Sequence, residues 1–146
     1  MLMTMFRRCF ALAGISVLTI FLAANPVADD SDKPLSNQTV SGLVRDIACP
    51  LQNKESTARR FNRDCALGCA RQGSPLAILA DDGTMYLPIS SSMPDTDQRS
   101  KLMPFVGKYV QVVGDVYERK GLHAVVIKQI KEDPSIQLQG DAFHRE

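Results

Sequence analysis

Segments in which apolar residues mix or alternate with polar ones, together with one short run of apolar residues at 76–80, predict five short β-strands in the middle of the chain. The five segments are residues 39–47, 76–80, 84–89, 109–117 and 122–130. Two pairs of these segments are joined by short turns, at residues 81–83 and 118–121, which is typical of β-hairpins. Gly42 and Gly114 interrupt two of the strands and predict a bend or a bulge at each position.

One stretch has the residues expected of a full helix. It begins at Asn62 or Asp64, both of which suit an N-cap, and ends near Gln72, where Gly73 and Pro75 follow. Residues three or four positions apart share one face of a helix, and in this helix they are Asn62, Cys65, Cys69 and Gln72.

Five short strands, one helix and the glycine bends predict a mainly β protein, a small five-stranded OB-like barrel. The usual helix of an OB domain lies between strands three and four, where residues 101–106 predict only a short helix. The clear helix is instead inserted between strands 1 and 2, in a loop with which OB domains often bind ligands. A generic β-sandwich is the alternative fold.

The first 24 residues have the pattern of a secretory signal peptide. Arg7 and Arg8 precede residues 10–24, which are uncharged and almost wholly apolar. Fifteen helical residues span roughly 22 Å, less than the ~30 Å hydrocarbon core of a bilayer, so a cleaved signal is favoured over an anchor. Neither Ala24 nor Ala28 completes an A-x-A site, so the position of cleavage stays open between residues 24 and 28. The Arg pair also partly resembles a twin-arginine signal, so both the general secretory (Sec) route and the twin-arginine route stay open.

The resulting domain organisation is a signal peptide at 1–24, a flexible leader at 25–37, an OB-like domain at 38–131 and a flexible tail at 132–146. A mature chain of about 118 to 122 residues is long enough for one domain with a modest core. We expect this domain in the periplasm or outside the cell. Contact with the membrane is expected only if the N-terminal segment is not cleaved.

Charge and motifs argue against several classes of function. Removing Arg7 and Arg8 from the 17 basic residues leaves 15, against 16 acidic residues, so the mature chain has almost no net charge. A chain with so little net charge has no strong positive electrostatic field that would attract nucleic acid or an anionic membrane. The sequence has no Ser-His-Asp order, paired-carboxylate motif, glycine-rich phosphate loop or nucleotide fingerprint, which favours a non-enzymatic module.

Three cysteines would remain after export, namely Cys49, Cys65 and Cys69. Three thiols cannot all pair within one molecule, so at least one stays free, pairs with another molecule or binds something. Cβ atoms four residues apart on a helix are separated by about 5–6 Å, more than the roughly 3.5–4.5 Å of a disulfide. Cys49 is therefore the better disulfide partner for either Cys65 or Cys69. Such a bridge would fix the loop and leave one thiol over.

The same cysteines also predict a metal site. Two ligands four residues apart on one helical face converge on a single ion, and Cys49 at the end of the first strand would complete a set of three thiolates. Thiolates select Cu(I) or Zn(II). Three-coordinate Cu(I) needs no further ligand, whereas Zn(II) would take a fourth from Asn62, Asp46, His123 or water. Thiol redox chemistry is a third hypothesis, although the Cys-x-x-Cys spacing of such sites is absent.

Residues 40–49 (VSGLVRDIAC) and 62–75 (NRDCALGCARQGSP) combine a G-x-v-x-D-x-x-C strand with an N-x-x-C-A-x-x-C helix. With a following hairpin and a strand like residues 107–114, they resemble a family of small exported bacterial proteins of unknown function. The similarity covers about residues 40–130, and Asn62 stands where that family usually has His. The resemblance implies a fold and a cysteine site, but no settled activity.

Two functional hypotheses follow from these patterns. The first is an exported, non-enzymatic binding module that holds a soft ion, copper or zinc, with Cys49, Cys65 and Cys69, and with Asn62 nearby. The second is a domain without metal in which a disulfide joins Cys49 to Cys65 or Cys69, and whose loop surface meets a protein partner.

Overall fold

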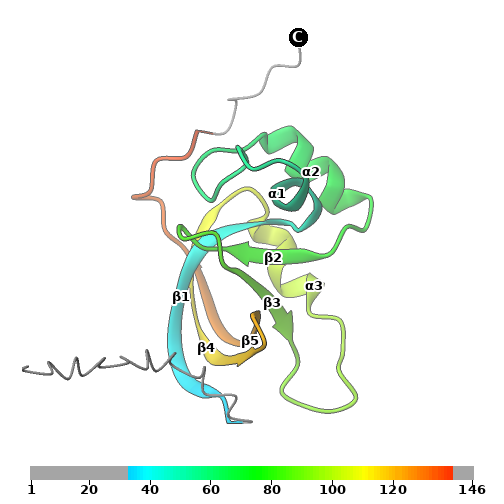
Figure 1. Ribbon diagram of the computed structural model, residues 1–146, viewed down its shortest axis with the longest axis vertical. Helices are drawn as coiled ribbons and strands as arrows, with labels where there is room; N and C mark the ends of the chain where they lie inside the picture. The colour runs from blue at the N-terminus through cyan, green and yellow to red at the C-terminus, as the bar shows by residue number, and fades with distance from the viewer. Residues whose placement is uncertain (1–32, 140–146) are drawn as a thin grey trace, which may run out of the picture.

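The structure, a computed structural model, describes residues 33–139. The predicted signal peptide at 1–24 and the proposed cleavage region lie outside the described residues. The elements, in chain order, are β1 (Leu35–Asp46), α1 (Ala48–Gln52), α2 (Arg63–Arg71), β2 (Leu76–Leu79), β3 (Met85–Ile89), α3 (Arg99–Leu102), the 3-10 helix η1 (Met103–Phe105), β4 (Tyr109–Arg119) and β5 (Leu122–Glu132) (Figure 1).

The five strands close into one barrel in the order β1-β2-β3-β5-β4. The long strand β1 makes closure possible, because its first part pairs with β4 and its last residues pair with β2. Strands β3 and β5 pair in parallel, whereas the other neighbours are antiparallel. The predicted mainly β fold, a five-stranded OB-like barrel with a helix inserted between strands 1 and 2, is confirmed. A closed barrel replaces the alternative sandwich.

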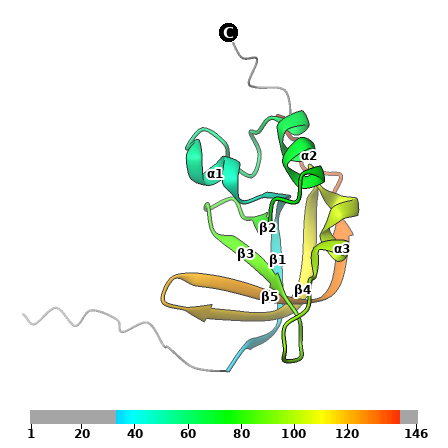
Figure 2. The same cartoon turned by 90° about the vertical axis from the view of Figure 1, so that its right-hand side faces the viewer.

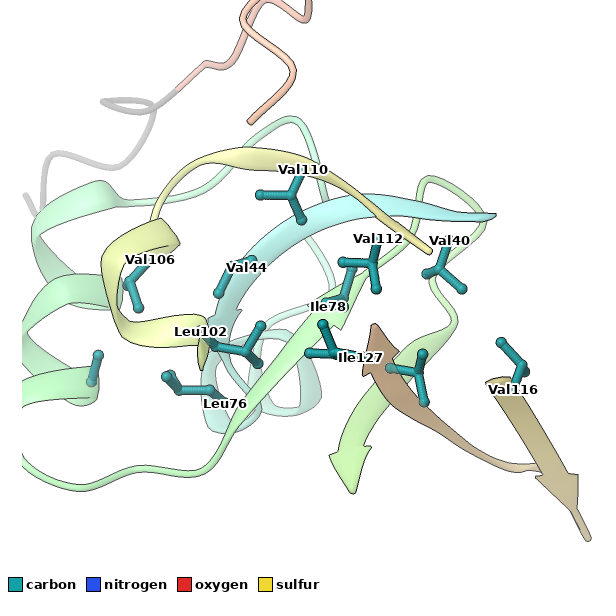
Figure 3. Packing of buried hydrophobic residues seen from close by; sticks show 12 residues of the cluster. Val40, Val44, Leu76, Ile78, Leu102, Val106, Val110, Val112, Val116 and Ile127 are labelled. Carbon is teal, nitrogen blue, oxygen red and sulfur yellow. The ribbon is translucent and has the colours of Figure 1, made fainter. Parts of the chain in front are cut away.

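Aliphatic side chains at alternating strand positions fill the barrel, because every second residue of a strand points inward. Val44 of β1 packs in one buried cluster with Val110 and Val112 of β4 (Figure 3). Leu102 and Val106, from the segment between β3 and β4, join the same cluster. The short helix predicted in this segment is therefore present as α3 and η1, and it carries part of the core.

Two glycines allow neighbouring strands to approach closely. The pairing of β4 with β5 shifts register between Val113 and Gly114, so the predicted bulge is confirmed. A Cβ atom at Gly114 would collide with the carbonyl oxygen of Val126, and one at Gly42 would collide with the carbonyl oxygen of Leu79. Only glycine fits at these two crossings.

The segment between β1 and β2 forms an outer layer in which α1 and α2 lie together at one end of the barrel (Figures 1 and 2). Beneath it lies a second hydrophobic cluster, which consists of Leu43, Ala58, Phe61, Ala66, Leu79 and Tyr109. The sequence predicted one helix here, and the structure adds α1. Its five residues are too few to show a helical period.

The folded domain extends beyond both ends of the predicted range 38–131. Strand β1 begins at Leu35, and after β5 the side chains of Ile136 and Leu138 pack against the second cluster. Gln139 then pairs with Arg60 in the inserted segment. These contacts make residues 35–37 and 132–139 part of the domain instead of a leader and a tail.

Within the described part of the chain, no helix has the length and apolar composition needed to cross a bilayer.

Candidate metal centre

The structure brings the three cysteines together. Cys49 comes from α1, and Cys65 and Cys69 come from successive turns of α2. Their Sγ atoms all lie within 4.8 Å of one another, and Cys49 Sγ lies 3.3 Å from Cys65 Sγ. All three are half-buried free thiols. The spatial convergence expected from the sequence is therefore present.

Helix α2 sits on the barrel through small side chains. Ala66 and Ala70 are buried, and their short side chains let the helix approach the strands closely. Cys65 and Cys69 precede them by one position, so they lie at the edge of this contact. Arg99 of α3 donates a hydrogen bond to the carbonyl oxygen of Ala70, which holds the last turn of α2 in place.

Asn62 is the N-cap of α2, one of the two caps that the sequence allowed. Its Oδ1 accepts the backbone N–H of Cys65 at 2.7 Å. The Asn62→Ala variant is expected to lose about 1 kcal/mol of unfolding free energy, because this N–H loses its acceptor. Urea unfolding of the reduced, metal-free protein measures the loss. The Asn62→Asp variant keeps an acceptor and should stay close to the wild type, so equal losses in both variants would contradict the capping role.

A buried ion pair at the end of β1 positions α1. Asp46 Oδ1 accepts the backbone N–H of Cys49 at 2.9 Å, and Asp46 Oδ2 lies 3.4 Å from Arg45 Nη2. Arg45 Nη1 donates to Ser56 Oγ at 2.6 Å, and the guanidinium lies over the ring of Phe61. Arg45 and Asp46 are 1% and 0% exposed. This network ties both ends of the α1 loop to β1.

Arg45 and Ser56 were not predicted as site residues from the sequence, and Asp46 was predicted only as a possible metal ligand. The sequence feature that could have indicated burial of Arg45 is its position on β1. Arg45 lies two residues after Leu43 and therefore on the same face of the strand. That face becomes buried because the inserted loop covers it. The alternation of β1 alone is compatible with a solvent-exposed Arg45, so the loop decides its burial.

The side chains considered as a fourth ligand make other contacts in the structure. Asn62 Oδ1 and Asp46 Oδ1 each accept a backbone N–H, from Cys65 and Cys49 respectively. The ring of His123 packs edge-on against Tyr86, with 5.5 Å between the ring centroids. Among the His, Cys, Asp and Glu side chains of residues 33–139, only the three Sγ atoms converge as potential metal ligands.

Burial and mutual contact raise the pKa values of two thiols. The pKa of Cys49 is raised to about 12, first by burial, then by its hydrogen bond with Cys65 and by the negative charge of Asp46, while Arg45 opposes the shift. Burial, followed by the charge of Asp46, also raises the pKa of Cys69. Near neutral pH these two thiols are therefore protonated, and a metal ion must displace their protons to bind.

Comparison with known proteins gives no relative from which a function could be transferred. No family model, no curated protein and no solved structure matches the chain. The OB-like description therefore rests on the barrel topology itself. The resemblance to small exported bacterial proteins rests on the motif residues alone.

Proposed function

We propose that this chain is an exported, non-enzymatic module that binds one soft metal ion, Cu(I) or Zn(II), through Cys49, Cys65 and Cys69. The observation that carries the proposal is the convergence of three Sγ atoms, from two helices, within 4.8 Å of one another. Thiolates are the ligands that select these two ions. The N-terminal signal pattern supports export, and sequencing the N-terminus of periplasmic protein tests it.

The spacing of the sulfur atoms fits such an ion. With metal–sulfur bonds near 2.3 Å, sulfur atoms around one ion lie about 3.8 Å apart in a tetrahedral site and about 4.0 Å apart in a trigonal site. The Cys49–Cys65 separation of 3.3 Å lies just below these values, and the upper limit of 4.8 Å lies just above them. Shifts of less than about 1 Å would place all three sulfur atoms at bonding distance.

Cu(I) and Zn(II) differ in the number of ligands that they require. Cu(I) is satisfied by three thiolates, whereas Zn(II) takes a fourth ligand, which water can supply at a half-buried site. The bound ion would also link α1 to α2, since Cys49 is on one helix and the other two ligands are on the other. The protein would contribute the soft donor set and its fixed spacing.

Metal analysis and thiol titration test this function on protein purified from the periplasm. We expect one Cu(I) or Zn(II) ion per chain, and three titratable thiols only after a chelator has removed it. Arg71→Ala changes an exposed residue of α2 and should leave the stoichiometry unchanged. Protein that takes up neither ion after reduction and remetallation would contradict the proposal.

The 3.3 Å contact between Cys49 and Cys65 also favours a second candidate, a disulfide-stapled domain that meets a protein partner through its loop. A bridge between residues 16 positions apart would contribute on the order of 3 kcal/mol in the chain-entropy model. One titratable thiol per chain in protein isolated without reductant, together with no metal uptake after reduction, would support this candidate. Cys49→Ser would then destabilise the protein at every metal concentration.

A further inference from the structure

Cys49 and Cys65 belong to different helices, and yet their sulfur atoms are in contact at 3.3 Å. We propose that these two residues are a reversible disulfide site, whose formation releases the bound ion and leaves Cys69 as the one remaining thiol. The inference rests on the proposed metal function, because it makes the disulfide and the metal complex two alternative states of the same site.

Helix geometry excludes a bond between Cys65 and Cys69, and the 3.3 Å contact makes Cys65 the partner of Cys49. Cys65 and Cys69 are four residues apart on α2, where Cβ atoms are separated by about 5–6 Å, whereas a disulfide requires about 3.5–4.5 Å. A bond between them would unwind a helix whose Ala66 and Ala70 are buried against the barrel. Cys49 lies outside α2, so its bond to Cys65 leaves the helix intact. The two sulfur atoms need to approach by a little over about 1 Å to reach bonding distance.

Helix α1 is the element that supplies this movement. None of its five residues is buried, so a small displacement disturbs no core packing. The hydrogen bond from Cys49 N–H to Asp46 Oδ1 holds the backbone near β1 while the Cys49 side chain turns toward Cys65. Movement of α2 toward α1 is unfavourable, because the buried side chains of Ala66 and Ala70 fix α2 on the barrel.

Oxidation of this pair removes two of the three metal ligands. A disulfide sulfur carries no thiolate charge, and thiolate is the form that binds metal. Cys69 alone would hold the ion through a single bond. The ion therefore leaves when the disulfide forms, and reduction rebuilds the site.

The oxidant required is itself a disulfide, either that of a small thiol such as glutathione disulfide or that of an exported thiol oxidase. One thiolate of the pair attacks a sulfur atom of the oxidant, forming a mixed disulfide and releasing the other oxidant sulfur as a thiolate. The second thiolate of the pair attacks the protein sulfur of the mixed disulfide, which forms the Cys49–Cys65 bond and releases the second oxidant thiolate. The pair loses two electrons, the oxidant gains them, and the released thiolates take protons from solvent. The charge of the ion does not change.

The test uses protein purified from the periplasm, without the predicted signal peptide that carries Cys9. It is reduced and loaded with one equivalent of Zn(II), or of Cu(I) if it takes up only that ion. Glutathione disulfide is added, free thiols are alkylated, and the disulfides are mapped by mass spectrometry. We expect one ion released for each Cys49–Cys65 bond formed, with alkylation at Cys69. Dithiothreitol followed by fresh ion should restore the complex. Cys69→Ser should still form the bond, whereas Cys65→Ser should form an intramolecular bond at least about tenfold more slowly.

Two kinds of failure are distinguishable in this design. A bond mapped to Cys65–Cys69 or to Cys49–Cys69, or an ion that stays bound after complete oxidation, would overturn the inference while leaving metal binding intact. A chain that takes up neither ion fails at the loading step, before oxidant is added. That result would overturn the proposed function and this inference with it.

Discussion

The Cys69→Ser variant is expected to bind Cu(I) more than about 100-fold more weakly than the wild type, because residues that only orient a ligand already contribute about 10–100-fold. Cys69 is the informative position, since its replacement leaves the contact between Cys49 and Cys65 in place. Serine is nearly isosteric with cysteine, so the half-buried position should tolerate it without unfolding. Competition with a chromogenic Cu(I) chelator measures the affinity.

The same variant should change the pH dependence of binding. The pKa values of Cys49 and Cys69 are raised in the metal-free protein, so their protons must leave when the ion binds. We expect Cys69→Ser to release about one proton fewer per ion than the wild type. Apparent affinity should rise with pH, by up to about tenfold per pH unit for each displaced proton.

Arg71→Ala is the matched control, because Arg71 lies on the same helix but is exposed. Its affinity and proton release should equal those of the wild type. If Cys69→Ser bound Cu(I) as tightly as the wild type, Cys69 would not be a ligand, and the site would be reduced to the Cys49–Cys65 pair.

Replacing Asp46 by Ala is expected to lower the unfolding free energy of the reduced, metal-free protein by about 3–5 kcal/mol. Arg45 would keep its charge at 1% exposure, without the carboxylate that faces it. Within the described residues, Arg45 Nε already has no hydrogen-bond partner, so little in this network is left to compensate. The Cys49 N–H would also lose its acceptor. Urea unfolding measures the change.

Two further variants separate the charge from the rest of the network. Ser56→Ala removes only the hydroxyl that accepts from Arg45, so we expect a smaller loss of about 1–3 kcal/mol. The double variant Arg45→Met, Asp46→Leu removes both charges and should recover much of the stability lost in Asp46→Ala, since a buried ion pair is often replaced by apolar residues at little cost. A loss below about 1 kcal/mol in Asp46→Ala would contradict the proposed role of the pair.

Much of the fold could be predicted because its elements follow local rules. The patterns of apolar residues, alternating in some segments and continuous in residues 76–80, located all five strands within a few positions of their observed ends. Asn62 before α2 and Gly73 after it marked the limits of the helix, since capping chemistry depends on neighbouring residues alone. Gly114 was correctly placed at a bulge, because a glycine inside a strand often marks one.

The parts that escaped prediction depend on partners far apart in the sequence. Leu35 continues β1 because β4 offers it a neighbouring strand, and Ile136 is held by the cluster under the inserted loop. Arg45 and Ser56 meet eleven residues apart, after the chain has turned through α1. Local periodicity carries no information about such contacts.

By itself the sequence determined the type and order of the strands, the inserted helix α2 and the placing of two cysteines on one side of it, because these depend on spacing and on adjacent residues. Only the tertiary structure decided that Cys49 reaches the other two thiols and that Cys65 is in contact with it. The position of Cys49 depends on the path of the chain after β1, and this path is set by the closed barrel and by the buried Arg45–Asp46 pair. A long-range packing arrangement of this kind has no counterpart in residue spacing.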